Sequence, residues 1–178
     1  MTRLYAFVIA AVLAACAPAS AALKIGDAAP VFETQASLGG KVFDFSLADA
    51  LKRGPVVLYF YPAAFTKGCT IEAHDFAEAI DKYTALGATV IGVSHDNIDT
   101  LNKFSVSECR SKFAVAADPQ LTVAKQYDAI LKLDPKYADR TSYVISQDAK
   151  IVYQYTSLNP DQHVQNTLAA LQALKAKQ

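Results

Sequence analysis

The segment from Val56 to Glu72, VVLYFYPAAFTKGCTIE, constrains the fold more than any other part of the chain. It opens with six apolar or aromatic residues without polar alternation, and Pro62 ends this run. Such a run is typical of a strand that is covered on both faces, as at the centre of an α/β sheet. Because proline cannot donate a hydrogen bond to a sheet, we expect the strand to stop at Pro62.

An amphipathic helix is predicted to follow this strand from Thr70 onward. Phe76 and Ile80 recur at helical spacing, and Gly87 is a suitable stop. Cys69 therefore lies where a buried strand leads into the first turn of a helix.

The position of Cys69 matters because the thiolate is the reactive form of cysteine. Unpaired N–H groups and the positive end of the dipole at a helix start lower the pKa of a thiol from ~8.5 toward roughly 3.5–7.5. Thr66 lies three residues earlier, where its hydroxyl can cap the turn or touch the sulfur. The alternative for an isolated cysteine is a small side chain that only packs in the core.

The remaining patterns are those of one α/β domain over residues 23–178. Further strands are expected at 42–45, 89–94, 114–117, 142–145 and 151–155, with helices at 96–112 and from Pro160 onward. The apolar residues of the last helix keep helical spacing at Val164, Leu168, Leu171 and Leu174. Two apolar strands joined by one amphipathic helix form a βαβ unit with parallel neighbours, and the last two strands form an antiparallel hairpin. We therefore expect a mixed central sheet flanked by helices.

Charge and composition exclude several classes of function. Lys plus Arg equals Asp plus Glu at 17 each, so the chain offers no basic surface for nucleic acid or an anionic membrane. The cysteines are Cys16, Cys69 and Cys109. They include no C-x-x-C pair, which argues against a thioredoxin-type dithiol or a zinc ribbon. The histidines, which are too scattered to predict a metal cluster, are His74, His95 and His163.

Residues 1–22 have the pattern of an export leader. Arg3 supplies the positive start, an apolar core follows over 4–13, and small residues come next. Two processing outcomes stay open. The Ala-Ser-Ala sequence at 19–21 fits a cleavage site that releases a soluble chain, whereas the residues that end at Cys16 match a bacterial lipobox. We expect export to the bacterial periplasm, with a membrane anchor only if Cys16 is lipidated.

The pattern Pro62-x-x-x-Thr66-x-x-Cys69 resembles the active-site motif of the peroxiredoxins. The longer run from Phe60 to Ala73 is similar to the Q-type branch of that family, the bacterioferritin comigratory proteins. The resemblance covers nearly the whole chain after the leader and implies a thioredoxin-like fold. It also implies an antioxidant thiol peroxidase that reduces hydrogen peroxide and small organic hydroperoxides without a metal or another cofactor.

The same resemblance assigns roles around Cys69, which becomes the peroxidatic nucleophile. It implies that Thr66 and the Cys69 amide hold the peroxide, and that Pro62 shields the sulfur from water and overoxidation. It also implies that Arg140, just before a predicted strand, lowers the thiol pKa and polarises the substrate. The alternative for Arg140 is a solvated side chain at the end of a charged loop. Glu72 either orients this arginine or complements the helix dipole.

The residue that reacts with the oxidised sulfur does not follow the common pattern of the branch. Many Q-type members carry a resolving cysteine five residues after the first, but that position here is His74. Another subset of the branch places this thiol in the third helix, where Cys109 is expected. The resemblance therefore implies a Cys69–Cys109 disulfide, reduced by a thioredoxin-like protein, in a monomer or weak dimer. Two alternatives stay open: a one-cysteine cycle reduced by an external thiol, and a peroxide-sensing protein of low turnover.

Overall fold

The computed structural model describes residues 23–177, and the predicted leader, with Cys16 and both processing sites, lies outside the described residues. Seven strands form one sheet: β1 (Glu33–Leu38), β2 (Lys41–Ser46), β3 (Val56–Phe60), β4 (Thr89–Ser94), β5 (Ala114–Ala117), β6 (Thr141–Ile145) and β7 (Ile151–Thr156). The helices are α1 (Leu47–Leu51), α2 (Lys67–Ala85), α3 (Ile98–Ser107), α4 (Thr122–Gln126) and α5 (His163–Lys175), with a 3₁₀ turn η1 (Pro160–Gln162). Within this part of the chain, no helix combines the length and apolar character needed to cross a bilayer.

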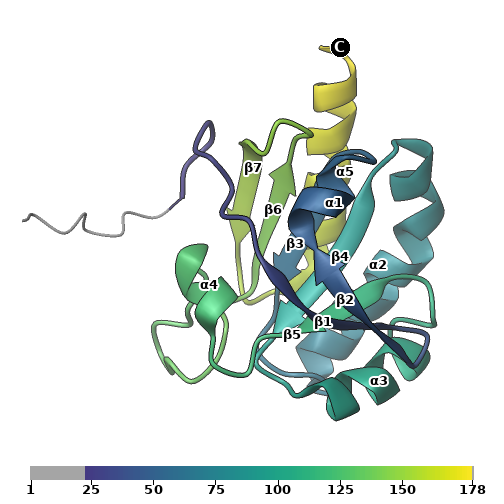
Figure 1. Ribbon diagram of the computed structural model, residues 1–178, viewed down its shortest axis with the longest axis vertical. Coiled ribbons are helices and arrows are strands. Elements are labelled where there is room, and N and C mark those ends of the chain that lie inside the picture. Colours follow the sequence, from purple (N-terminus) through teal and green to yellow (C-terminus); the bar gives the residue numbers. More distant parts are fainter. Residues whose placement is uncertain (1–22, 178) are drawn as a thin grey trace, which may run out of the picture.

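The sheet is mixed, as the sequence predicts, with the strand order β2-β1-β5-β4-β3-β6-β7 (Figure 1). The predicted βαβ unit consists of β3, α2 and β4, because β3 pairs in parallel with β4. On its other side β3 pairs antiparallel with β6, and β6 and β7 form the predicted antiparallel hairpin. Helices α1 and α4 cover one face of the sheet, and α2, α3 and α5 cover the other (Figure 1).

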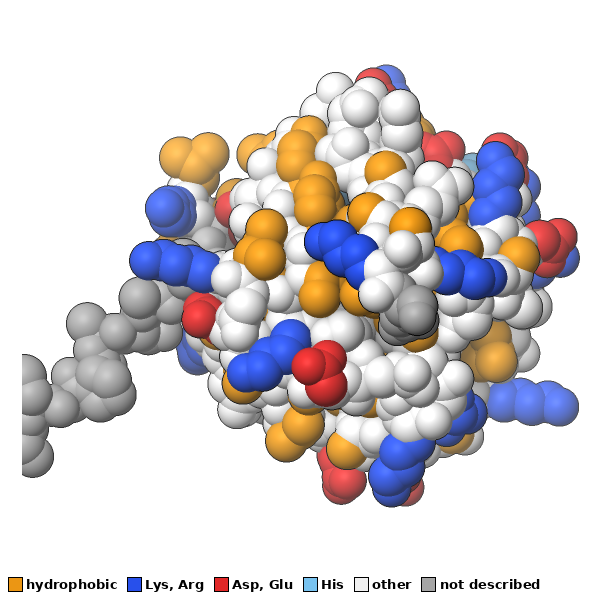
Figure 2. Space-filling view, turned by 90° about the horizontal axis from the view of Figure 1, so that it is seen from above, with side chains coloured by type: hydrophobic (Ala, Val, Ile, Leu, Met, Phe, Trp, Pro, Cys, Tyr) orange, Lys and Arg blue, Asp and Glu red, His pale blue; other side chains and the backbone are white. Residues whose placement is uncertain are grey.

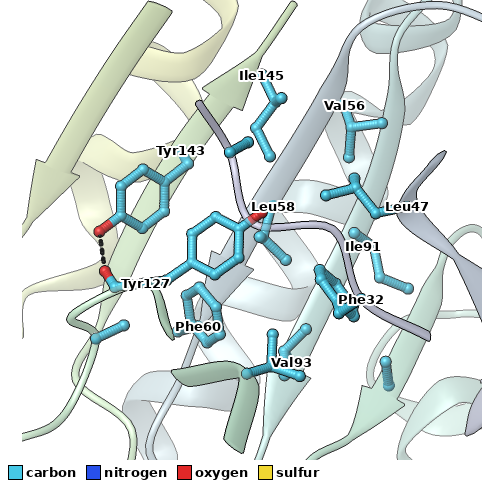
Figure 3. Packing of buried hydrophobic residues seen from close by; sticks show 14 of the residues in the cluster. Phe32, Leu47, Val56, Leu58, Phe60, Ile91, Val93, Tyr127, Tyr143 and Ile145 are labelled. Atoms are coloured by element: carbon cyan, nitrogen blue, oxygen red, sulfur yellow. Dashed lines mark hydrogen bonds between the residues drawn. The ribbon is translucent and has the colours of Figure 1, made fainter. Parts of the chain in front are cut away.

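The central strand β3 is buried along its whole length, which confirms the interpretation of its apolar run. Its alternate side chains enter two separate cores. Val56, Leu58 and Phe60 face α1 and α4, where Figure 3 shows them packed with side chains of β4, β6 and Tyr127. Because both faces of β3 are covered, the loop that follows it begins from a rigid position.

On the opposite face, aromatic stacking seats α2 on the sheet. Tyr59 of β3 stacks on Phe76 of α2, with ring centroids 4.4 Å apart. Gly92 of β4 leaves the space for this ring, since a Cβ atom there would lie 2.7 Å from Tyr59 Cζ. The packing of α2 against β3 and β4 therefore fixes where the helix begins.

The third helix is shorter than the sequence predicts. A helix is expected over 96–112, but α3 ends at Ser107, so Cys109 lies just beyond it. Arg110 and Ser111 adopt left-handed conformations with φ of 51° and 56°. These conformations stop a right-handed helix. Neither glycine nor proline marks this helix end in the sequence, so the residue pattern alone predicts continuation.

The surface charge is distributed rather than concentrated on the face that Figure 2 shows. Basic and acidic side chains lie there among hydrophobic and other polar ones (Figure 2). The formal net charge of the whole chain is zero at neutral pH.

Candidate active site

Cys69 lies in the first turn of α2, which begins at Lys67 rather than at the predicted Thr70. The first hydrogen bond of this turn runs from Thr70 N to Thr66 O at 2.9 Å. The N–H group of Cys69 therefore has no acceptor within the helix and points toward the helix start. These amides and the positive end of the helix dipole favour negative charge on the sulfur or on a ligand beside it.

Arg140 brings a positive charge to this sulfur from a different element. It directly precedes β6, and the β3–β6 register pairs Phe60 with Thr141, so the arginine arrives beside the end of β3. Its Nη2 lies 3.4 Å from Cys69 Sγ, and its Nε donates to Leu158 O at 3.0 Å. A guanidinium this close places a positive charge and a hydrogen-bond donor directly beside the buried sulfur.

Two residues of α2 shape the approach of this guanidinium. At Gly68 a Cβ atom would lie 3.0 Å from Arg140 Nη2, so the absence of a side chain lets the arginine reach the sulfur. One turn further on, Glu72 accepts a hydrogen bond from Arg140 Nη1 through its Oε2. Because Cys69 and Glu72 lie on the same face of the helix, one guanidinium contacts both.

The carboxyl group of Glu72 is fully buried. Burial raises the pKa of this carboxyl to about 8, although the charge and hydrogen bond of Arg140 act to lower it. Among the described residues its Oε1 has no hydrogen-bond partner, and His163 Nδ1 lies 3.7 Å from it. Glu72 is therefore placed to orient Arg140. This role stays a prediction.

The structure differs from the prediction at Thr66. Its hydroxyl donates to Ala63 O at 3.0 Å and makes no capping hydrogen bond to α2. The expected side-chain cap is wrong, because a nearby backbone carbonyl takes the hydroxyl instead. Thr66 nevertheless occupies the N-cap position, so its side chain lies beside the turn that carries Cys69. Its role in holding peroxide stays a prediction.

The loop between β3 and α2 is fastened to the end of β4. His95 Nδ1 lies 2.8 Å from the carbonyl oxygen of Pro62, which can only accept a hydrogen bond. Asp96 Oδ2 accepts from Ala64 N at 2.7 Å and from Ser94 Oγ at 2.8 Å. These contacts hold Pro62 and the residues after it in place above the sheet edge. The predicted shielding by Pro62 is not tested by them.

Cys109 belongs to the same core as Cys69 but comes from the segment after α3. Both cysteines are buried and free. Burial raises the pKa of the Cys109 thiol well above its usual value. Two side-chain contacts fasten the segment around Cys109 to α2: His74 Nε2 to Glu108 Oε2 at 2.9 Å and Arg110 Nη1 to Glu78 Oε1 at 3.1 Å. His74, at the position of the missing second cysteine, thus contacts the neighbour of Cys109.

His163 is a buried residue of this region that the sequence does not reveal. Its Nδ1 lies 2.8 Å from Ser142 Oγ, and its Nε2 lies 2.9 Å from Ser157 O. The buried residues of α5 are His163, Thr167 and Leu171, whereas the prediction considered apolar positions alone. The spacing of four between His163, Thr167 and Leu171 is the one sequence signal that indicates this buried face of α5.

The side chains brought together here define the available chemistry. A thiolate can attack an electrophilic atom, and the adjacent guanidinium and amides can stabilise negative charge on the group that departs. Over residues 23–177, no three His, Cys, Asp or Glu side chains are arranged to hold a metal ion.

Comparisons with known proteins place these features in context. The model of the AhpC/TSA family matches residues 25–154. Peroxiredoxin Q from the chloroplast of rice, Oryza sativa subsp. japonica, is 33% identical over 150 residues, which is 84% of this chain and 67% of the relative. The crystal structure of peroxidoxin BcpB from Mycobacterium tuberculosis is 34% identical, with a TM-score of 0.77 over 85% of this chain and 98% of that one. AhpC of Enterococcus faecalis, at 22% identity and a TM-score of 0.77 over 85% of this chain and 92% of that one, shares the fold.

Proposed function

The chain belongs to the AhpC/TSA family, and from this premise we propose that it reduces hydrogen peroxide and small organic hydroperoxides through a sulfenic acid on Cys69. Its relatives are peroxiredoxins, so it is a thiol peroxidase, an oxidoreductase with a thioredoxin-like fold. The single observation that carries the proposal is the 3.4 Å contact between Arg140 Nη2 and the buried Cys69 sulfur. This contact supplies the cation that a reactive thiolate needs.

In the first step the Cys69 thiolate attacks one oxygen of the peroxide. A sulfur–oxygen bond forms and the oxygen–oxygen bond breaks, so the sulfur is oxidised to sulfenic acid and the peroxide is reduced. The departing hydroxide or alkoxide takes a proton and leaves as water or alcohol. Arg140 and the first-turn amides are positioned to stabilise the negative charge that grows on the departing oxygen.

For the second step we propose that Cys109 resolves the sulfenic acid. The Cys109 sulfur attacks the Cys69 sulfur, a disulfide forms, and the hydroxyl group leaves as water. A dithiol protein of the thioredoxin type then reduces the disulfide by thiol exchange and becomes oxidised itself. The shared core of Cys69 and Cys109 supports this pairing, because both side chains belong to the same buried cluster on one face of the sheet.

Resolution by Cys109 requires the segment after α3 to move. A buried thiol with a raised pKa is a poor nucleophile, and a disulfide needs Cα atoms within about 7 Å. The contacts of His74 and Arg110 with their glutamate partners must open for this movement. The left-handed residues Arg110 and Ser111 favour opening, since non-glycine residues hold this conformation at a cost of about 1–2 kcal/mol each.

The complete burial of Cys109 favours a second candidate cycle. In that cycle an external thiol attacks the Cys69 sulfenic acid directly, and Cys109 only packs in the core. The products are a mixed disulfide and water, and a second thiol then restores Cys69.

Replacing Cys109 with serine separates the two cycles. After one equivalent of hydrogen peroxide, the wild-type protein should yield a Cys69–Cys109 disulfide in non-reducing peptide mapping. The Cys109→Ser variant should stop at a sulfenic acid that dimedone traps on Cys69. Its first reaction with peroxide should keep the wild-type rate, whereas its turnover with thioredoxin should fall by about tenfold or more, because the intramolecular attack is lost.

The control is the Cys69→Ser variant, which should give neither disulfide nor dimedone adduct. A Cys109→Ser variant that turns over with thioredoxin as fast as wild type would reject Cys109 as the resolving residue and support the external-thiol cycle.

A further inference from the structure

The side chain of His74 joins the helix of Cys69 to the segment that carries Cys109. Its Nε2 lies 2.9 Å from Glu108 Oε2, and Glu108 directly precedes Cys109. A carboxylate oxygen can only accept, so Nε2 carries the hydrogen whether the ring is neutral or charged. No step of the proposed reaction uses this imidazole, although its partner adjoins the proposed resolving residue.

Glu108 and Cys109 are held in one place by the end of α3. Glu108 is the C-cap residue of this helix, and both Glu108 N and Cys109 N donate to Phe104 O, at 2.9 and 3.1 Å. The carbonyl groups that end a helix carry partial negative charge, so a carboxylate at this position needs a compensating donor. His74 supplies that donor from α2. A contact that holds the Glu108 side chain therefore also restrains Cys109.

The contact of His74 holds this segment more strongly than the contact of Arg110. The side chains of Arg110 and Glu78 are 45% and 66% exposed, and ion pairs at such exposed positions contribute little to stability. The side chains of His74 and Glu108 are 35% and 19% exposed. Water therefore competes less for the hydrogen bond of His74, and its loss costs more.

The rest of the segment combines burial with backbone strain. Residues 108–113 belong to no helix or strand, and Arg110 and Ser111 adopt left-handed conformations that are unfavourable for residues with a Cβ atom. Cys109 is fully buried and Phe113 is 3% exposed, which favours the closed position. Closure is a balance between this burial and the backbone cost, and the hydrogen bond of His74 adds to the closed side.

We propose that the hydrogen bond from His74 to Glu108 keeps Cys109 buried and thereby slows the resolving step. His74 is a positioning residue for that step and takes no part in the reaction with peroxide. Because resolution is slowed, the sulfenic acid on Cys69 lasts longer before it is reduced. The inference rests on the proposed function, because that function makes Cys109 the resolving residue.

Alkylation of the buried thiol by iodoacetamide measures the opening of the segment. In the full chain with Cys69→Ser, peptide mass spectrometry follows the label on Cys109 at a series of low urea concentrations. We expect a rate that depends little on urea, because a local opening exposes much less surface than global unfolding does.

Two replacements of His74 in this background separate the hydrogen bond from the bulk of the ring. His74→Leu keeps an apolar side chain without a donor and should raise the rate of Cys109 labelling by about two- to tenfold, the effect of one lost hydrogen bond. His74→Gln retains an N–H donor at about the reach of Nε2, so it should label more slowly than the leucine variant.

Removing the acceptor provides the decisive comparison. Glu108→Ala should raise the labelling rate at least as much as His74→Leu, because the charge of Glu108 adds to burial in raising the pKa of the Cys109 thiol. Adding His74→Leu to Glu108→Ala should then change the rate little, since the contact is already absent. Lys52→Met is the matched control: it breaks a 2.7 Å contact with Asp49 on α1 and should leave the rate unchanged.

The same replacement should act on the reaction when Cys69 is intact. After one equivalent of hydrogen peroxide, rapid quenching with N-ethylmaleimide and peptide mapping follow the Cys69–Cys109 disulfide. In the His74→Leu variant this disulfide should form faster by about the factor found for labelling. The first reaction with peroxide should keep its wild-type rate.

Four results would each overturn the proposal. They are labelling that follows the urea dependence of global unfolding, an unchanged rate in His74→Leu or an equally high one in His74→Gln, an equal rise when His74→Leu is added to Glu108→Ala, and faster labelling without faster disulfide formation. The proposed resolving role of Cys109 fails by a different observation, the absence of the disulfide in the oxidised wild-type protein. Labelling reads the opening whether or not Cys109 resolves the sulfenic acid.

Discussion

Replacing Arg140 with methionine should slow the reaction of Cys69 with hydrogen peroxide by about 10²–10³-fold, the usual cost of one lost charge-stabilising donor. Methionine keeps an unbranched apolar side chain but removes the guanidinium that lies 3.4 Å from the sulfur. The variant loses the cation beside the sulfur and, with it, the stabilisation of the departing oxygen. Stopped-flow rates at neutral pH measure this loss.

Stability must be measured beside the rate, because Arg140 also pairs with the buried Glu72. Leaving a buried polar group without its hydrogen-bond partner costs about 1–3 kcal/mol. The double variant Arg140→Met with Glu72→Gln also removes the buried ionisable carboxyl that loses its partner, so urea unfolding should show part of the stability regained. Its peroxide rate should stay low. Arg110→Met is the matched control, since it breaks an exposed contact with Glu78 and should leave the rate unchanged. A double variant as fast as wild type would contradict the role of Arg140.

Replacing Cys69 with serine should reduce peroxide consumption by about 10⁴-fold or more, as removal of a nucleophile does in other covalent enzymes. A serine hydroxyl stays protonated at neutral pH, and its oxygen cannot form the stable equivalent of a sulfenic acid. The side chain is 2% exposed and changes little in size, so the free energy of unfolding should change by about 1 kcal/mol. Loss of hydrogen peroxide with dithiothreitol as reductant measures the effect.

Cys109→Ser is the matched control in the same assay, because it removes a buried thiol from the same core and should retain the first reaction with peroxide. Consumption that persists in the Cys69→Ser variant would place the nucleophile on another residue and reject the proposed mechanism.

The part of the site that lies on consecutive elements could be predicted from local patterns. The apolar run of β3, its end at Pro62 and the helix that follows place Cys69 in a first helical turn. These inferences need no knowledge of which distant segments pack together, and the structure agrees with each of them.

Arg140 depends on a pairing that no local pattern contains. It reaches Cys69 because β6 pairs beside β3 in a register that joins Phe60 to Thr141. An arginine that precedes a strand can reach many parts of a fold, and the resemblance to a known family is what identifies Arg140. His163 was missed because its burial follows from how α5 packs against the sheet and α2, and that packing surface includes polar residues.

The end of α3 shows a third limit of sequence patterns. The residues after Ser107 have no glycine or proline, yet Arg110 and Ser111 take left-handed conformations. A hydrogen bond from Ser111 N to Ser105 O at 2.9 Å and the burial of Cys109 hold this turn. Tertiary contacts therefore override helix propensity here, and they place Cys109 beyond the helix in a segment able to open.

The most direct test of the central claim, that Arg140 and the start of α2 make Cys69 a reactive nucleophile toward peroxide, is the stopped-flow rate constant of the wild-type protein with hydrogen peroxide at neutral pH. Dimedone trapping in the same reaction identifies the oxidised residue. The account predicts a rate constant orders of magnitude above that of free cysteine, with the adduct on Cys69. A rate constant no greater than that of free cysteine, or an adduct on another residue, would contradict it.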